Sequence, residues 1–374
     1  MRSHITGLCI VLCLCLVGST GTVFSDSFSS DRLFTLSYGS TSGQLGVRFP
    51  VGDAEGGPPA GPTDIAVGRD GSIYIADRVN KRIQRFDASG ELLMEAKAVD
   101  RKTEHVAAYE RGRGAEVPPH VNELDNIQRV AVDSQGCAYV QFGAAIDLLA
   151  KFAADGQGLW YMHLADAIPL EVRETYGPFF GNISIGPADT LCMRLSGRSA
   201  DGIAILDADG RFLRTVSGYA CTPNGRIVAF ARPTGASLAT AVRMYDTEGL
   251  ELISFFADPV TADPTLFADM DSFSGTAFDG AGNLYKLAMG VREQRIDLSP
   301  QLTIGCDEVV VRFDQSGRAT AGIRFPGSPF PAGRHVAVDQ AGNIYRLAYG
   351  ADSVDIVRYA LDTSTPEYTS LRDD

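Results

Sequence analysis

The sequence has few of the residues that metal centres and nucleic-acid interfaces need. Its 374 residues include five histidines and seven cysteines, and 46 acidic residues outnumber 33 basic ones, for a net charge of −13. An acidic protein repels a phosphate backbone, so we exclude nucleic acid as a partner. No CxxC or Cys/His spacing indicates zinc, and no Ser–His–Asp or phosphate-loop pattern occurs. We therefore assign no catalytic residue, no metal and no cofactor.

Long hydrophobic runs are also missing, except at the start of the chain. Residues 8–17 are apolar, follow Arg2 and precede small residues, and this run is too short to span a bilayer. We predict a signal peptide over residues 1–25, and hence an exported protein that is periplasmic or extracellular. We expect no transmembrane segment and a monomer.

Only a few cysteines follow the predicted signal peptide, namely Cys137, Cys192, Cys221 and Cys306. An exported protein can form disulfides. The first three cysteines fall within strand patterns, however, where cysteine often serves as a small apolar residue, so buried free thiols are favoured. If any pair forms, Cys192 and Cys221 are the expected partners, because they lie in adjacent repeats. The pairing stays open.

What the sequence has in abundance is short β-hairpins. Residues 61–93 hold four short apolar runs, of which the first two flank a turn at Asp70 and Gly71. The last two flank an Asp-x-x-Gly turn from Asp87 to Gly90. Aspartate hydrogen-bonds its own turn backbone and glycine accepts positive φ, so the segment predicts an antiparallel meander.

The same unit recurs along the chain. Its aligned first-strand positions are Ala66, Ala131, Ser184, Ala220, Ala277 and Ala337. A recurring four-stranded unit predicts a β-propeller. The pattern resembles the NHL-repeat family of six-bladed β-propellers, most clearly over residues 62–93. That resemblance implies an all-β fold in which residues 31–374 form a single six-bladed propeller of four-stranded antiparallel blades. It does not imply one function, because the family includes binding scaffolds and a few enzymes.

An N-terminal strand is expected to close the ring. The last unit lacks the Asp-x-x-Gly turn before its fourth strand, and residues 33–38, LFTLSY, have no unit of their own. We predict that this segment forms the outer strand of blade 6, which removes an exposed strand edge. The rival for that position is residues 367–371.

Nearly all the additional residues fall on one face of the predicted disc. They are the crossovers at residues 98–125, 165–181 and 257–273, and the loop at residues 289–307. Functional residues collect on loops held by a rigid scaffold, so we expect the ligand site on this long-loop face. Within the insertions, residues 100–111 and 169–176 have helical character.

The aligned repeats also place polar residues at the mouth of the central channel on that face. Asp64, Arg129, Asn182 and His335 occupy the first positions of four inner strands. Together they could bind an anion or a polar small molecule; alternatively, they satisfy one another around a solvated channel. With an ordinary pKa of about 6.5, His335 would gain a proton on mild acidification.

The sequence favours a binding or scaffold function over catalysis. We interpret the chain as an exported NHL-repeat β-propeller that binds an unknown protein or a small polar ligand through its long-loop face. The alternative is an extracytoplasmic, lactonase-like hydrolase or lyase with a site in the central funnel.

Overall fold

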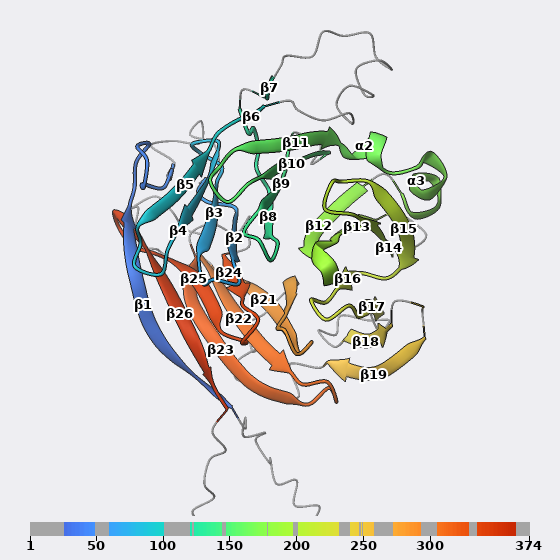
Figure 1. Ribbon diagram of the computed structural model, residues 1–374. Helices are drawn as coiled ribbons and strands as arrows, with labels where there is room; N and C mark the ends of the chain where they lie inside the picture. Colours follow the sequence, from blue (N-terminus) through green and yellow to red (C-terminus); the bar gives the residue numbers. More distant parts are fainter. Residues whose placement is uncertain are drawn as a thin grey trace, which may run out of the picture.

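The computed structural model describes residues 26–48, 60–100, 120–121, 123–143, 147–177, 179–196, 201–231, 240–246, 248, 250–257, 272–292, 305–328 and 335–363. These residues form six four-stranded antiparallel sheets, which stand as blades around a central channel (Figure 1). The predicted fold, an all-β six-bladed propeller, is confirmed. The predicted signal peptide, residues 1–25, lies outside the described residues.

The strands of the first three blades follow one another along the chain. Blade 1 contains β2 (Asp64–Val67), β3 (Ile73–Asp77), β4 (Arg82–Phe86) and β5 (Leu92–Ala96). Blade 2 contains β8 (Arg129–Val132), β9 (Ala138–Phe142), β10 (Leu148–Phe152) and β11 (Gly158–His163). Blade 3 contains β12 (Phe179–Ile185), β13 (Leu191–Ser196), β14 (Asp201–Leu206) and β15 (Phe212–Ser217).

The last three blades repeat this order until the final position. Blade 4 contains β16 (Ala220–Cys221), β17 (Ile227–Ala231), β18 (Thr240–Tyr245) and β19 (Glu251–Ala257). Blade 5 contains β20 (Ser272–Phe278), β21 (Leu284–Arg292), β22 (Gly305–Phe313) and β23 (Ala319–Ser328). Blade 6 contains β24 (Val336–Val338), β25 (Ile344–Tyr349) and β26 (Ser353–Asp362), and its outer strand is β1 (Ser27–Ser37).

Small elements lie in the connections between blades. Between blades 1 and 2, β6 (Val99–Asp100) pairs with β7 (His120–Val121). Between blades 2 and 3 lie α2 (Leu164–Ala167) and α3 (Leu170–Tyr176), and η2 (Pro187–Asp189) lies within blade 3. The helix predicted over residues 169–176 is therefore present, with Pro169 at its N-cap and Gly177 at its C-cap. The other predicted helix, residues 100–111, lies almost wholly outside the described residues.

The repeated turn is held by its aspartate. In blade 6 one carboxylate oxygen of Asp339 accepts hydrogen bonds from the backbone amides of Ala341 and Asn343, both at 2.9 Å. The other oxygen accepts from the Asn343 amide group at 2.8 Å and from the Tyr345 hydroxyl at 3.2 Å. Gly342 has a φ of 91°, which glycine adopts without strain. The recurring Asp, Gly and Tyr of the sequence are thus one hydrogen-bonded unit.

Apolar side chains fill the space between neighbouring blades. The buried core divides into six clusters, and each one lies mainly at one blade boundary. The cluster between blades 1 and 2, for example, contains Tyr74, Val130 and Phe152. The Tyr74 hydroxyl also donates to the Gly136 carbonyl of blade 2 at 2.8 Å. Because burial of apolar area is the main favourable term in folding, the blades stabilise one another as neighbours.

The N-terminal segment contacts both the last blade and the first. Strand β1 pairs antiparallel with β26 from Ser27↔Asp362 to Ser37↔Ser353, along the outer edge of blade 6 (Figure 1). The chain then continues into residues 38–46, here called the N-terminal strap, which lie against blade 1. The contribution of this segment to closing the ring stays a prediction, and the rival residues 367–371 lie outside the described residues.

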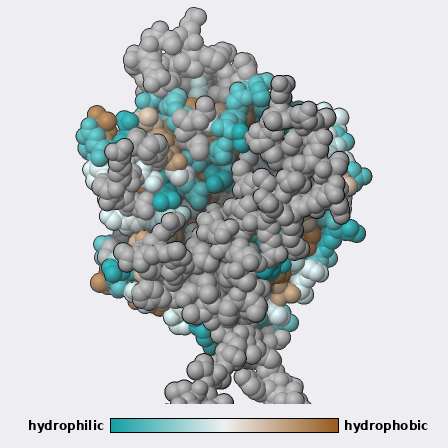
Figure 2. Space-filling view, turned by 180° about the vertical axis from the view of Figure 1, so that it is seen from behind, coloured by the Kyte–Doolittle hydropathy of each residue, from teal (hydrophilic) through white to brown (hydrophobic). Residues whose placement is uncertain are grey.

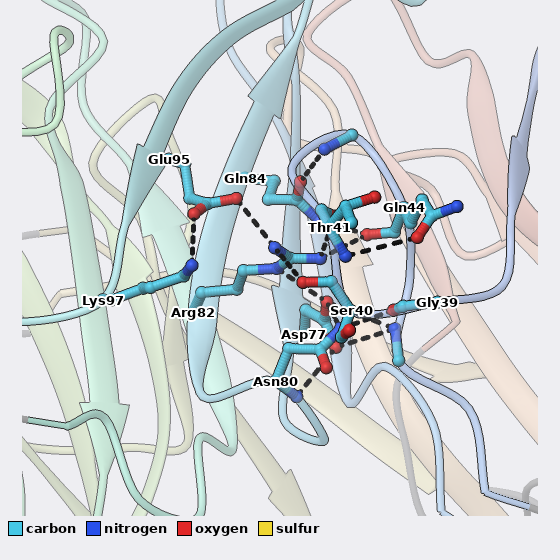
Figure 3. Close-up of polar contacts among 12 residues, drawn as sticks. Gly39, Ser40, Thr41, Gln44, Asp77, Asn80, Arg82, Gln84, Glu95 and Lys97 are labelled. Atoms are coloured by element: carbon cyan, nitrogen blue, oxygen red, sulfur yellow. Dashed lines mark hydrogen bonds and ion pairs between the residues drawn. The ribbon is translucent and has the colours of Figure 1, made fainter.

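A buried arginine holds the strap. Arg82 has no exposed surface, and its guanidinium donates to the backbone carbonyls of Ser40, Thr41 and Gln44 at 3.3, 2.8 and 2.7 Å (Figure 3). It also forms ion pairs with Asp77 at 3.0 Å and Glu95 at 2.8 Å. A buried charge is tolerated only when it is paired and hydrogen-bonded, and these contacts supply both conditions.

The surface of the described residues is mixed. On the face shown in Figure 2, the coloured residues are largely hydrophilic, and the hydrophobic ones form small separate groups. Among the described residues, no helix is long and apolar enough to span a membrane.

Candidate functional site

A cavity of about 360 Å³ occupies the central channel. The inner strands of all six blades contribute to its wall. The small residues at the aligned positions of these strands line it, namely Ala66, Ala131, Ser184, Ala220, Ala277 and Ala337. The positions that align the repeats in the sequence are therefore the positions that leave space in the channel.

The cavity opens toward the tight turns that join the first and second strands of the blades. Arg69, Ser134 and Gln340 belong to these turns, are exposed and line the cavity. Asn182 lines it from the opposite, long-loop side. The cavity thus reaches a face that the sequence analysis did not consider for ligand entry. The insertions at residues 101–119, 258–271 and 293–304 lie outside the described residues.

Blades 3 and 4 give the cavity a cationic and aromatic wall. The Arg194 guanidinium stacks over the Tyr219 ring with 3.9 Å between the guanidinium carbon and the ring centroid. Tyr219 in turn packs edge-on against Phe230, with 4.7 Å between the ring centroids. Both Arg194 and Tyr219 line the cavity. A guanidinium over the face of an aromatic ring is attracted to it by a cation–π interaction.

Three of the predicted mouth residues link consecutive blades. The carboxylate of Asp64 in blade 1 accepts a hydrogen bond from the Val130 amide of blade 2 at 2.9 Å. Nε of Arg129 in blade 2 donates to the amide oxygen of Asn182 in blade 3 at 2.8 Å. Asp64 and Arg129 begin their inner strands as expected, whereas Asn182 is the middle residue of β12, and among the three only Asn182 lines the cavity. Arg129 and Asn182 are bonded to each other, whereas Asp64 accepts from the backbone amides of Ile65 and Val130, and ligand binding by the three stays a prediction.

His335 lies in a buried cluster at the same end of the channel. Its Nε2 is 3.3 Å from the Pro62 carbonyl oxygen of blade 1, and its Nδ1 is 3.8 Å from a carboxylate oxygen of Glu308. The Arg346 guanidinium approaches the other carboxylate oxygen of Glu308 at 3.4 Å, and the Tyr349 ring packs edge-on against the imidazole. His335 is 1% exposed and does not line the cavity.

Burial changes the titration of this cluster. Desolvation lowers the pKa of His335 below its ordinary value, although the nearby Glu308 carboxylate opposes the shift. Desolvation also raises the pKa of Tyr349. The ordinary pKa that the sequence analysis assigned to His335 is therefore wrong. Local sequence does not indicate this enclosure, because the groups that surround the imidazole come from distant strands.

The described residues include no group of three or more His, Cys, Asp or Glu side chains placed to hold a metal ion. Cys137, Cys192 and Cys221 are free thiols, and the latter two are buried, as the strand patterns indicated. The side chain of Cys306 lies outside the described part of the chain.

The geometry defines the protein as a β-propeller with a lined central channel. The family model for the NHL repeat matches residues 60–86, which cover most of blade 1. The resemblance found in the sequence is thus confirmed: the chain is a six-bladed β-propeller that carries an NHL repeat. A comparison with curated proteins gives no match.

Solved structures with a similar fold are remote in sequence. Kuenenia stuttgartiensis hydrazine synthase is 13% identical over 76% of this chain and 72% of that chain, with a TM-score of 0.43. A member of the duf4221 family from Bacteroides vulgatus is 11% identical over 90% and 99%, with a TM-score of 0.43. Virginiamycin B lyase from Staphylococcus aureus is 13% identical over 76% of each chain, with a TM-score of 0.37. At these values no functional argument rests on them.

Proposed function

We propose that this protein is an exported binding module that takes a small organic anion with an apolar body into its central channel. The observation that carries this proposal is the cavity of about 360 Å³, with a wall built by all six blades. Small-molecule sites typically have volumes of roughly 300–1,000 Å³, mainly apolar walls and a few placed polar groups. Export rests on the N-terminal pattern of Arg2 followed by a short apolar run.

The chemistry of the wall selects the ligand class. Five alanines among the small inner-strand residues offer an apolar surface to the body of a ligand, and the sixth residue, Ser184, adds a hydroxyl. Arg194 supplies a positive charge beside Tyr219, and Asn182 adds an amide. The one acidic residue among those that line the cavity, Asp339, directs both carboxylate oxygens into its own turn. A carboxylate or sulfonate joined to an apolar group fits this arrangement.

A pair of matched variants tests the site. Ala277→Leu replaces a methyl with an isobutyl group in the channel wall, and Ala88→Leu makes the same change in an exposed turn of blade 1. The full chain is screened by thermal shift against small aromatic and aliphatic carboxylates and sulfonates. Compounds that raise the melting temperature of the wild type and of Ala88→Leu should leave the melting temperature of Ala277→Leu unchanged. Equal shifts in all three proteins would place the site outside the channel.

A hydrolase or lyase remains the second candidate, with His335 and Glu308, 3.8 Å apart, as its acid–base pair, although both are buried and neither lines the cavity. An imidazole beside a carboxylate is the arrangement that general acid–base chemistry uses. Hydrolysis of simple ester and lactone probes by the wild type, abolished in His335→Gln, would support this candidate over the binding module.

A further inference from the structure

Two thiols from neighbouring blades meet in the wall of the channel. Cys192 lies on β13 of blade 3, and Cys221 lies on β16 of blade 4. They are 2% and 5% exposed, and both line the cavity. The two thiols are hydrogen-bonded to each other, and both are free in this structure. The sulfur atoms therefore face each other across a blade boundary.

The surroundings hold this pair in place. Cys192 and Cys221 pack with Ile203, Ile205 and Ile227, and the Thr190 side chain also hydrogen-bonds Cys192. The hydrogen bond from Cys221, together with burial, raises the pKa of the Cys192 thiol. The Cys192 thiol is therefore protonated near neutral pH, and it reacts slowly until a reagent reaches it through the cavity.

The boundary between blades 3 and 4 also has the smallest apolar cluster among the described residues. Its apolar cluster has five buried residues, the fewest of the six clusters among the described residues, and two of those five are the cysteines. A covalent link at this boundary would therefore reinforce this smallest cluster.

We propose that Cys192 and Cys221 are a modification site, at which a low-molecular-weight disulfide entering the channel converts them to an inter-blade disulfide. One cysteine, as its thiolate, attacks a sulfur of the small disulfide and forms a mixed disulfide, and the first small thiol leaves. The second cysteine then attacks the protein sulfur and releases the second small thiol. Two S–H bonds are lost, one S–S bond forms, the small disulfide is reduced to two thiols, and the protons end on those thiols.

The two side chains already contact each other across the blade boundary. The sulfur atoms must approach from hydrogen-bond contact to about 2.05 Å, and the cavity gives space for the mixed-disulfide intermediate. The new bond would close a loop from residue 192 to residue 221. A loop of that length restricts the unfolded chain, and we expect the melting temperature to rise by about 5 °C.

The test uses the full chain. Reduced protein is incubated with oxidised glutathione at a pH of about 8.5, where more of the thiol is ionised. Peptide mapping without reductant should show the Cys192 peptide joined to the Cys221 peptide. The melting temperature should rise, and dithiothreitol should reverse both changes. The rate of oxidation should increase with pH, because the thiolate is the reacting form.

Two variants and one unfolded sample make the outcome decisive. Cys137→Ser should behave as the wild type does, whereas Cys221→Ser should lose the rise in melting temperature. If Cys221→Ser fails to fold, the peptide map of the wild type decides alone. The proposal is overturned if the folded thiols stay unreacted while urea-unfolded protein reacts, or if the cross-link joins Cys137 or Cys306 instead.

Discussion

Replacing Arg82 by methionine should release the N-terminal strap and destabilise the folded chain by about 4 kcal/mol. Removing one partner of a buried ion pair typically costs about 3–5 kcal/mol, because the other charge is left buried and uncompensated. Arg82 has no exposed surface, and it pairs with Asp77 at 3.0 Å while donating to three strap carbonyls. Methionine fills similar space but supplies none of these donors.

The loss should depend on pH with a definite sign. Burial raises the pKa of Asp77 above its ordinary value, although the Asn80 and Arg82 side chains oppose the shift. A carboxyl with a raised folded pKa binds its proton more readily in the folded chain, so stability falls as pH rises through that window. Without the Arg82 guanidinium, the pKa of Asp77 in the folded chain rises further. The difference in the free energy of unfolding between Arg82→Met and the wild type should therefore be largest near neutral pH and smaller near a pH of about 5.

Urea unfolding followed by tryptophan fluorescence measures this directly. The chain has a single tryptophan, Trp160, which is 3% exposed in blade 2 and reports on unfolding of the ring. Lys97→Met is the matched control: Lys97 pairs with Glu95 at 2.7 Å, but its side chain is 55% exposed, so its loss should cost less than about 1 kcal/mol. If Arg82→Met loses no more stability than Lys97→Met, the strap does not depend on Arg82.

Two further variants test the turns and the buried cluster. Asp339→Ala should cost about 2–3 kcal/mol in urea unfolding, since its carboxylate accepts four hydrogen bonds, whereas Asp246→Ala, which loses two backbone bonds, should cost about 1 kcal/mol. Equal losses would show that the asparagine and tyrosine contacts add nothing. Burial lowers the pKa of His335 in the folded chain. The neutral imidazole therefore contributes to the free energy of unfolding above the unfolded pKa of about 6.5, and this contribution is lost as pH falls below that value. Between a pH of about 7.5 and about 5.5 the wild type should lose about 1 kcal/mol more than His335→Gln, and parallel pH profiles would contradict this.

The sequence predicts those parts of the fold that depend on local chemistry. The Asp-x-x-Gly turns fix the hairpins within a few residues, so the blades and the inner-strand positions of Asp64 and Arg129 follow from the repeats alone. The small residues at the aligned positions define the repeats in the sequence, but only the structure shows that they line the channel.

What the sequence does not predict depends on distant segments. In the sequence, Arg82 looks like an ordinary polar residue of a hairpin. It is buried because the N-terminal strap, which precedes it by about forty residues in the chain, lies over it. The enclosure of His335 by Glu308 and Tyr349 likewise joins separate strands. The stacking of Arg194 on Tyr219 links blades 3 and 4 and has no local signal. Contacts of this kind arise when the ring closes.

Ligand binding in the central channel is the claim on which the proposed function depends. The most direct test is isothermal titration of the compound with the largest thermal shift into the wild type, Ala88→Leu and Ala277→Leu. We expect one site per chain, with equal affinity in the wild type and Ala88→Leu. In Ala277→Leu the dissociation constant should be at least tenfold larger, which corresponds to a loss of about 1.4 kcal/mol of binding free energy. Undiminished affinity in Ala277→Leu would contradict a channel site and place the ligand elsewhere on the protein.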